Sequence, residues 1–273
     1  MKTMYKSFLF LVMFSSFFAM SCKKEGKVGK DNSLNIFSLA DDISLGKQVV
    51  AQIDADPAQY PQLDEASYPE AYTHIRGIRD KILNSGLVSY KDQFEWRVKI
   101  IHRDDVLNAF AVPGGYMYFY TGLIKFLDNE AQFAGVMAHE MAHAARRHST
   151  DQLTKTYGIE LLLAIILGDN PSQAAQIAAG LAEGLSSLAF SRADENEADE
   201  YAVKYLYVTE YNAPSLADFF TKLGNESTVP VFLSTHPSPD NRITHINEVW
   251  QGLGGASGQL LETEYAQFKA SLP

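Results

Sequence analysis

The sequence predicts a mainly helical α+β fold with a small antiparallel sheet. Apolar residues recur at helical spacing in several segments of the 273-residue chain, and acidic residues stand near their starts. Two stretches between these segments, 94–102 and 108–120, have the composition of extended strands. A further segment, 131–145, is apolar nearly all round, which is typical of a helix buried in a core.

Length and charge limit the class of protein. A chain of this size can bury one sizeable core, so we expect a single domain over 39–250, followed over 251–273 by a glycine-rich break and a short helix. The formal net charge is -10, from 23 basic and 33 acidic residues. Nucleic acid is therefore not an expected partner, because binding to phosphates needs clustered positive charge.

The first 21 residues have the form of an export signal. Lys2 and Lys6 precede an apolar stretch, Phe8 to Met20. This stretch is shorter than the roughly 20 apolar residues that a membrane-spanning helix needs. The alternative is an uncleaved membrane anchor.

Cys22 is the only cysteine and directly follows this stretch. Residues 19–22 resemble the cleavage site of a bacterial lipoprotein signal, although Met20 departs from the usual pattern. In this interpretation Cys22 carries a lipid, residues 22–38 form a lipidated tether, and no disulfide can form. Lys23 is, by the same resemblance, compatible with sorting to the outer membrane. A buried or incidental cysteine is the alternative.

The first half of the domain is predicted to hold two helices and the sheet. Helical spacing covers Leu39–Ile53 and Tyr68–Leu87. The segment 94–102 alternates apolar and basic residues in the manner of a strand, and 108–120 is a second extended stretch that Pro113-Gly114-Gly115 interrupts. We expect these stretches to pair as a small antiparallel sheet.

The second half is predicted to be helical. Asn129 and Gln132 have the spacing of a capping box, which opens a helix that runs to about His148. Apolar helices are expected at 159–167 and 174–188, and another at 194–207. The two apolar helices could also be a membrane hairpin, but their short runs and the charged residues within them speak against it.

The helix that begins at Asn129 contains the pattern H-E-x-x-H, formed by His139, Glu140 and His143. On a helix with about 100° per residue, His143 lies about 40° and Glu140 about 100° from His139. Two histidines one turn apart can share a tetrahedral zinc ion, and the carboxylate beside them can reach a water. Two solvent-facing histidines on a surface helix are the alternative, but this helix is too apolar to be exposed.

The third zinc ligand has to come from another segment. On a continuous helix His148 lies about 180° from His139, and we interpret it as structural. The longer pattern H-E-x-x-H-x-x-G-x-x-H also fails, because Arg146 and Ser149 replace its last two fixed residues.

The segment 191–199 supplies the candidate ligand. Glu195 and Asp199 lie one turn apart on the apolar face of the predicted helix, where a carboxylate is costly unless metal or hydrogen bonds satisfy it. We therefore expect Glu195 to bind zinc, and Asp199 to accept a hydrogen bond from the far nitrogen of a ligating histidine. Glu197 is the weaker candidate, because it faces the opposite side.

With these residues, the chain resembles the HtpX and CAAX prenyl endopeptidase family of gluzincins, and in particular its soluble envelope members. H-E-x-x-H followed by S-R-x-x-E-x-E-A-D carries the resemblance, together with 108–115, 235–237 and 242–243. The resemblance spans about 39–250. It implies a zincin-like metallopeptidase domain that holds one Zn²⁺ per chain.

The resemblance also implies further site residues. Asn108, Ala109, Phe110 and Ala111 would form an edge strand that pairs with an extended substrate backbone. His236 would lie near the metal, where it either stabilises the oxyanion or occupies the fourth metal position at rest. Arg242 would support it.

We therefore predict a zinc-dependent endopeptidase with Glu140 and His236 as catalytic residues. Its expected substrates are unfolded or misassembled proteins of the cell envelope, and its expected location is the periplasmic side of a membrane, through the lipid on Cys22. The alternative is an envelope chaperone or binding protein whose zinc site is held closed. Oligomeric state does not follow from the sequence.

Overall fold

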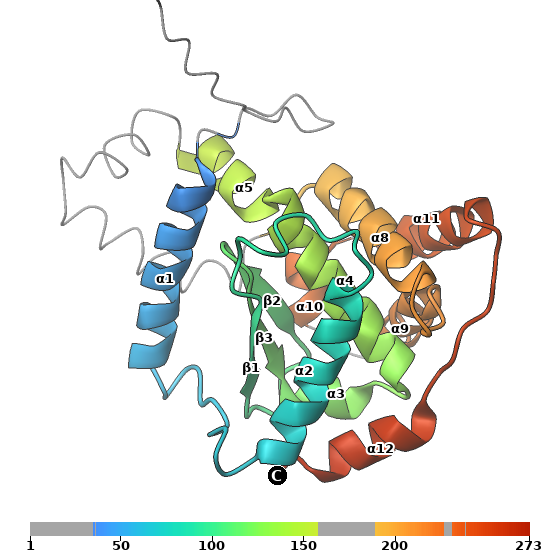
Figure 1. Ribbon diagram of the computed structural model, residues 1–273, viewed down its shortest axis with the longest axis horizontal. Helices are drawn as coiled ribbons and strands as arrows, with labels where there is room; N and C mark the ends of the chain where they lie inside the picture. The colour runs from blue at the N-terminus through green and yellow to red at the C-terminus, as the bar shows by residue number, and fades with distance from the viewer. Residues whose placement is uncertain (1–34, 36, 158–188, 227–230, 238) are drawn as a thin grey trace, which may run out of the picture.

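The computed structural model describes residues 35, 37–157, 189–226, 231–237 and 239–273 (Figure 1). The predicted signal peptide, Cys22 and the predicted helices at 159–167 and 174–188 lie outside the described residues, as does nearly all of the predicted tether.

The described elements form a mainly helical fold with one small sheet, which confirms the predicted fold class. In chain order they are α1 (Leu39–Ala55), α2 (Pro69–Leu83), β1 (Arg97–Ile101), β2 (Ala109–Val112), β3 (Tyr116–Tyr120), α3 (Thr121–Phe126), α4 (Glu130–Arg146), α5 (His148–Tyr157), α8 (Arg192–Tyr207), α9 (Ser215–Leu223), α10 (Val231–Thr235), α11 (Pro239–Gly252) and α12 (Glu262–Ala270).

The sheet is mixed, so the prediction that it is antiparallel was wrong for one of its two pairings. Its strand order is β1-β3-β2. β2 and β3 form the expected antiparallel hairpin, whose turn uses positive φ angles at Gly114 and Gly115. β1 lies beside β3 and runs parallel to it. Strand alternation identifies a strand but not its neighbour, and here β1 pairs with the far strand of the hairpin.

The two faces of the sheet bury different residues. On β3, Met117 and Phe119 join the large core formed with α2, α4, α8, α9, α11 and α12. Tyr116, Tyr118 and Tyr120 point to the other face, where they pack with α1. Figure 1 shows α1 on one side of the sheet and α4, α8 and α9 on the other, while α5 reaches back toward α1, whose cluster its Leu153 joins. Because successive side chains of a strand point to opposite faces of the sheet, the sheet separates the small core beside α1 from the large core on its other face.

Several helix ends differ from the prediction. α2 ends four residues before the predicted Leu87, and the chain then turns through Gly86 with a positive φ. α4 ends at Arg146, because Arg147 adopts the left-handed conformation (φ 66°, ψ 29°) and starts a new direction. α9 and α11 were not predicted.

In the described residues, none of the helices has both the length and the apolar character needed to cross a membrane.

Gly46 and Gly77 provide a matched test of how closely α1 packs on the hairpin turn. A Cβ at Gly46 would overlap the carbonyl oxygen of Pro113, whereas a Cβ at Gly77 meets nothing within 4 Å. We expect Gly46→Ala to lower the free energy of unfolding by roughly 1–3 kcal/mol. Gly77→Ala should raise it by about 0.5–1 kcal/mol, because alanine is the better helix former. Urea unfolding measures both, and equal stabilisation by the two substitutions would contradict the described contact.

Candidate metal centre

α4 carries the H-E-x-x-H motif through the middle of the core. The Asn129 side chain accepts a hydrogen bond from the backbone N–H of Gln132 and so caps the helix, as predicted. The expected return bond differs, since Oε1 of Gln132 accepts from the N–H of Asp128. Every residue from Glu130 to Ala145 is buried, which confirms the prediction of a buried helix.

α8 packs against α4 and brings the second motif to the same place. Ser191 and Asp194 form a capping box at its start, with hydrogen bonds in both directions. The capping box fixes the first turn, in which Glu195 faces inward, and Asp199 faces inward one turn later. At most 1% of either side chain is exposed. The helix thus presents two carboxylates to the histidines of α4.

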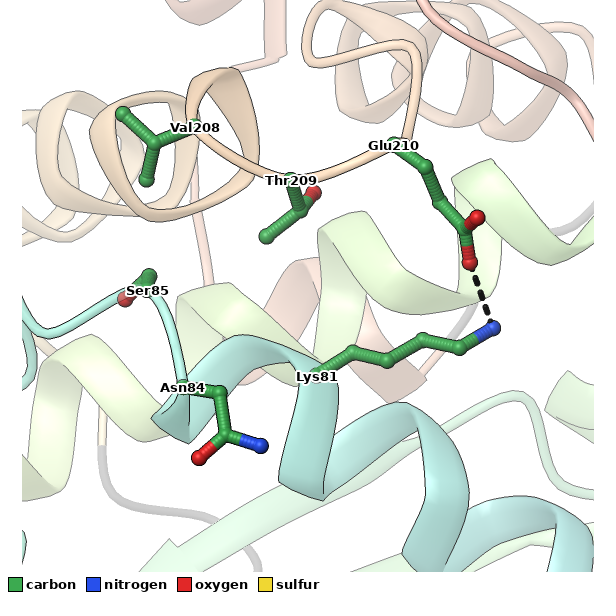
Figure 2. Close-up of a pocket in the computed structure, with 6 residues that line it drawn as sticks. All are labelled: Lys81, Asn84, Ser85, Val208, Thr209 and Glu210. Carbon is green, nitrogen blue, oxygen red and sulfur yellow. Dashed lines mark ion pairs between the residues drawn. The ribbon is translucent and has the colours of Figure 1, made fainter.

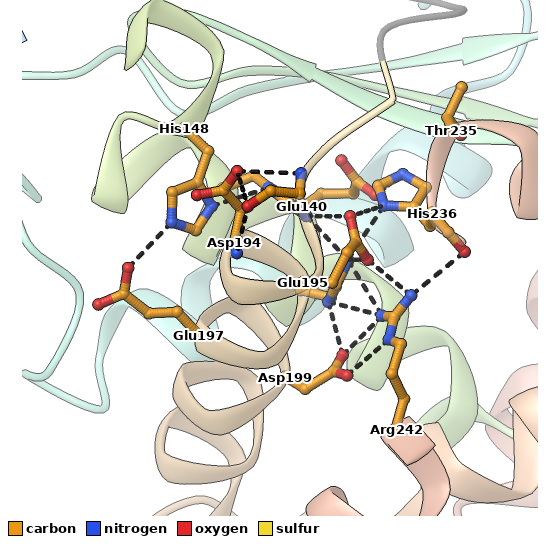
Figure 3. A network of polar contacts seen from close by, with 12 residues as sticks. Glu140, His148, Asp194, Glu195, Glu197, Asp199, Thr235, His236 and Arg242 are labelled. Carbon is orange, nitrogen blue, oxygen red and sulfur yellow. Dashed lines mark hydrogen bonds and ion pairs between the residues drawn. The ribbon is translucent and has the colours of Figure 1, made fainter. Parts of the chain in front are cut away.

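Four buried side chains converge at one point: His139, His143, Glu195 and His236. One ligand atom from each lies within 4.8 Å of all the others, and no other group of this kind exists among the described residues. The Nε2 atoms of His139 and His143 are 3.0 Å apart, and each lies 3.5 Å from a carboxylate oxygen of Glu195. Figure 3 shows this network, with His236 and Glu195 beside each other.

These separations fit a zinc ion. Ligand atoms at about 2.0–2.1 Å from a tetrahedral zinc lie roughly 3.3 Å from one another. Nδ1 of His236 is at a similar separation, 3.3 Å from Nε2 of His139 and 3.1 Å from Oε1 of Glu195. The group therefore offers three imidazoles and one carboxylate to a single ion.

Glu140 lies beside this group without belonging to it. Its Oε1 is buried and lacks a hydrogen-bond partner among the described residues. Nε2 of His236 lies 3.4 Å from that oxygen. A buried carboxylate oxygen without a partner is costly, which is expected where a small polar ligand belongs.

Arg242 is the countercharge to the carboxylates of Glu195 and Asp199. Its guanidinium lies 2.6 Å from Oε2 of Glu195 and holds both oxygens of Asp199, at 2.6 and 2.7 Å. Asp199 in turn lies 2.9 Å from Nδ1 of His139. Arg242 is 1% exposed and stacks over the ring of Phe220. Asp199 thus lies beside a histidine of the H-E-x-x-H motif, where the sequence analysis expects it.

Burial and charge set the pKa values of the group. Although burial lowers the pKa of His139, its contacts with Asp199 and Glu195 outweigh burial and raise it to about 9. Burial, together with the neighbouring His139, lowers the pKa of His143. Burial raises the pKa of Glu140 above that of an ordinary glutamate. A glutamate shifted upward is suited to exchange protons near neutral pH.

His148 is not where the sequence analysis expected it. It follows the left-handed turn at Arg147 instead of extending α4, and its Nδ1 lies 2.9 Å from Nδ1 of His143. Its other nitrogen contacts Glu197 at 3.0 Å. Phe190, also not predicted, stacks on the ring of His143 with centroids 4.1 Å apart. An arginine in the left-handed region gives no signal in the sequence, so these contacts could not be predicted.

The predicted substrate-binding residues lie on and before β2, at an edge of the sheet. Asn108, Ala109, Phe110 and Ala111 are all buried. Ala109 and Ala111 face the core that contains α4, and Phe110 faces α1. Oδ1 of Asn108 has no hydrogen-bond partner among the described residues.

A separate pocket of about 370 Å³ lies at the far end of α8, away from Glu195 (Figure 2). It is lined by Lys81, Asn84, Ser85, Val208, Thr209 and Glu210. Lys81 and Glu210 form an ion pair across it, at 2.7 Å. The lining of this pocket contains no group of metal-ligating side chains.

Comparisons with known proteins agree with this geometry. The sequence model of peptidase family M48 matches residues 74–249, more than half of the chain. Similar proteins include the putative beta-barrel assembly-enhancing protease of Vibrio cholerae, which is 34% identical over 161 residues, covering 54% of this chain and 33% of that protein. The beta-barrel assembly-enhancing protease of Escherichia coli is 31% identical over 155 residues, covering 51% and 31%.

A mitochondrial relative is similar as well. The mitochondrial metalloendopeptidase OMA1 of Schizosaccharomyces pombe is 28% identical over 186 residues, which cover 67% of this chain and 54% of that protein. The matched region spans about a third of the length of the bacterial relatives.

Replacement of Arg242 tests the charge balance of the centre. In Arg242→Met the carboxylates of Glu195 and Asp199 stay buried without their cation, so we expect the metal-free protein to lose roughly 3–5 kcal/mol of stability. Urea unfolding in the presence of a chelator measures this. Arg103→Ala is the control, since its ion pair with Asp105 is exposed and should contribute little. A similar small change in both variants would contradict the role given to Arg242.

Proposed function

Because the chain belongs to peptidase family M48, we propose that it is a zinc-dependent endopeptidase that cleaves unfolded or misassembled proteins of the bacterial cell envelope. Zinc dependence is general in this family. The observation that carries the proposal is the convergence of His139, His143 and Glu195 next to the unpartnered carboxylate of Glu140.

In this proposal His139, His143 and Glu195 hold one zinc ion per chain. When bound, zinc supplies Lewis-acid chemistry, since it polarises a carbonyl and lowers the pKa of a water. Glu140 accepts a proton from the attacking water and returns it to the leaving amine. Its raised pKa suits both steps, because a weaker carboxylic acid gives a stronger conjugate base. Asp199 and Arg242 keep His139 and Glu195 in place.

His236 has a role in the proposal that depends on its position. In the described conformation its Nδ1 lies at ligand distance from its neighbours, which supports occupation of the fourth metal position at rest. Its Nε2 lies beside Glu140, and after a small displacement it would be a donor to the oxyanion. We propose that the first arrangement is the resting state and the second the active one.

The substrate backbone is proposed to pair with β2. Asn108 to Ala111 lie at the sheet edge, and the free Oδ1 of Asn108 would meet a backbone N–H of the substrate. A peptide that adds a strand must be extended, so unfolded segments fit better than folded ones.

The location is proposed from the chain's first residues and from the names of its relatives. Residues 1–21 would be a lipoprotein signal and Cys22 the lipid-bearing residue, with the domain facing the periplasm from the outer membrane. Two relatives are named for beta-barrel assembly, which supports a role in the envelope. The narrower likeness to soluble envelope members of the HtpX and CAAX prenyl endopeptidase group belongs to this proposal too.

A second candidate function is an envelope chaperone or binding protein whose zinc site is kept closed. The position of His236 among the ligand atoms is the observation that favours it.

Glu140→Gln separates metal binding from catalysis. The amide cannot accept a proton, so we expect casein cleavage to fall by roughly 100-fold or more, while the zinc content stays at one per chain. Glu195→Ala is the counterpart and should lose both zinc and activity. Metal analysis and a casein assay on the same preparations measure the two properties. Full turnover by Glu140→Gln would exclude this residue as the base.

His236→Ala distinguishes the two candidate functions. In the proposed enzyme the wild type cleaves casein, and removal of the oxyanion donor should lower the rate of cleavage by roughly 100-fold at unchanged zinc content. Absence of cleavage by both wild type and variant, with zinc bound, would favour the chaperone.

A further inference from the structure

We propose that His148, supported by Glu197, is a positioning residue that fixes the ring orientation and the tautomer of His143. This inference rests on the proposed zinc site, in which His143 is a ligand. It concerns the side of the His143 ring that faces away from the metal.

The contacts form a chain behind His143. Nδ1 of His143 lies 2.9 Å from Nδ1 of His148, and Nε2 of His148 lies 3.0 Å from Oε2 of Glu197. The other oxygen of Glu197 accepts a hydrogen bond of 2.9 Å from Arg146. Figure 3 shows His148 and Glu197 joined on the side of the network opposite Arg242.

Counting donors assigns the hydrogens in this chain. An ionised Glu197 can only accept, so Nε2 of His148 carries the hydrogen of that bond. In a neutral imidazole the other nitrogen, Nδ1 of His148, is then an acceptor. Nδ1 of His143 must therefore donate, which leaves its Nε2 with a free lone pair. That is the nitrogen that faces the metal group, so the chain selects the tautomer that can bind zinc.

Arg146 holds Glu197 at the end of this chain. Its guanidinium lies 2.9 Å from Oε1 of Glu197 and over the ring of Tyr201, with 4.7 Å to the ring centroid. The carboxylate that accepts from His148 is therefore itself fixed by a charge-assisted hydrogen bond.

The ring of His143 is held in position from a second direction. Phe190 stacks on it with planes inclined by 26°, while His148 meets it edge to face. His148 reaches this place only because Arg147 turns the chain, and Arg147 is itself bound to Asp42 and to the carbonyl of Phe37. The Nδ1 side of His143 is therefore held by a chain of side chains. His139 is held in a comparable way, because its Nδ1 contacts Asp199 directly and Asp199 is bound by Arg242.

Three substitutions of His148 test this role on the full chain. In His148→Asn an amide oxygen stands at the place of Nδ1 and can accept from His143. The side chain in His148→Gln reaches Glu197 but offers nothing to His143, and His148→Phe keeps a ring without either nitrogen. We expect His148→Phe and His148→Gln to weaken zinc affinity by roughly 10–100-fold, the usual effect of losing a hydrogen-bond partner behind a ligand. The affinity of His148→Asn should stay within about threefold of wild type.

The measurements are zinc affinity, by competition with a chromophoric chelator, and the visible spectrum of the cobalt-substituted protein. His148→Phe and His148→Gln should both alter the cobalt spectrum, and His148→Asn should keep that of the wild type. If His148→Phe fails to fold, the comparison of His148→Asn with His148→Gln decides alone.

Wild-type affinity and spectrum in His148→Phe or His148→Gln would overturn the inference and leave the proposed function intact. Equal losses in His148→Asn and His148→Gln would also overturn it, since a merely structural role would not separate them. A wild type that binds no zinc would overturn the inference together with the proposed function.

Discussion

The burial of charged side chains at the site is the constraint on which the rest of this structure depends. Glu195 and Asp199 are at most 1% exposed, and an isolated carboxylate so placed would cost several kcal/mol or would be protonated. Both remain ionised because Arg242 lies within 2.7 Å of each and His139 within 3.5 Å. Although burial raises the pKa of both carboxyl groups, His236, Arg242 and the ring of His139 lower that of Glu195. Arg242 and His139 likewise lower the pKa of Asp199. Removal of one of these charged groups would therefore leave its partner buried without a countercharge.

This balance of charges requires that the helices of the site pack at fixed positions. Alanine and glycine recur along α4, so that neighbouring elements can approach it closely. A Cβ at Gly135 would meet the backbone of α9 at 3.2 Å. On the sheet side, Ala109 and Ala111 belong to the same core and leave space for the helix. The small side chains thus bring the ligand helix near its partners, and the polar stripe on the same helix supplies the chemistry.

Much of this could be predicted from the sequence, because the signals are local. The H-E-x-x-H spacing and the two carboxylates on one apolar face need only helical geometry, and the structure brings these side chains together. The expectations for His236 and Arg242 came from a family resemblance, since no local pattern links the end of α10 or α11 with α4. The parallel pairing of β1 and the left-handed turn at Arg147 were not predictable, because the first depends on distant contacts and the second on Asp42 and Phe37. The misplacement of His148 follows directly from the assumption of an uninterrupted helix.

The four members of the metal group are not held alike, and this difference bears on the proposed activity. His139 and His143 lie on the buried helix α4, and Glu195 lies on the inner face of α8. His236 follows the five-residue α10 and is held by the stacked ring of Phe232, 4.3 Å away, and by Arg242 at its carbonyl. The N–H of Phe232 donates to the carbonyl of Leu107, next to the proposed edge strand. α10 therefore links the backbone next to β2 with the segment that carries His236.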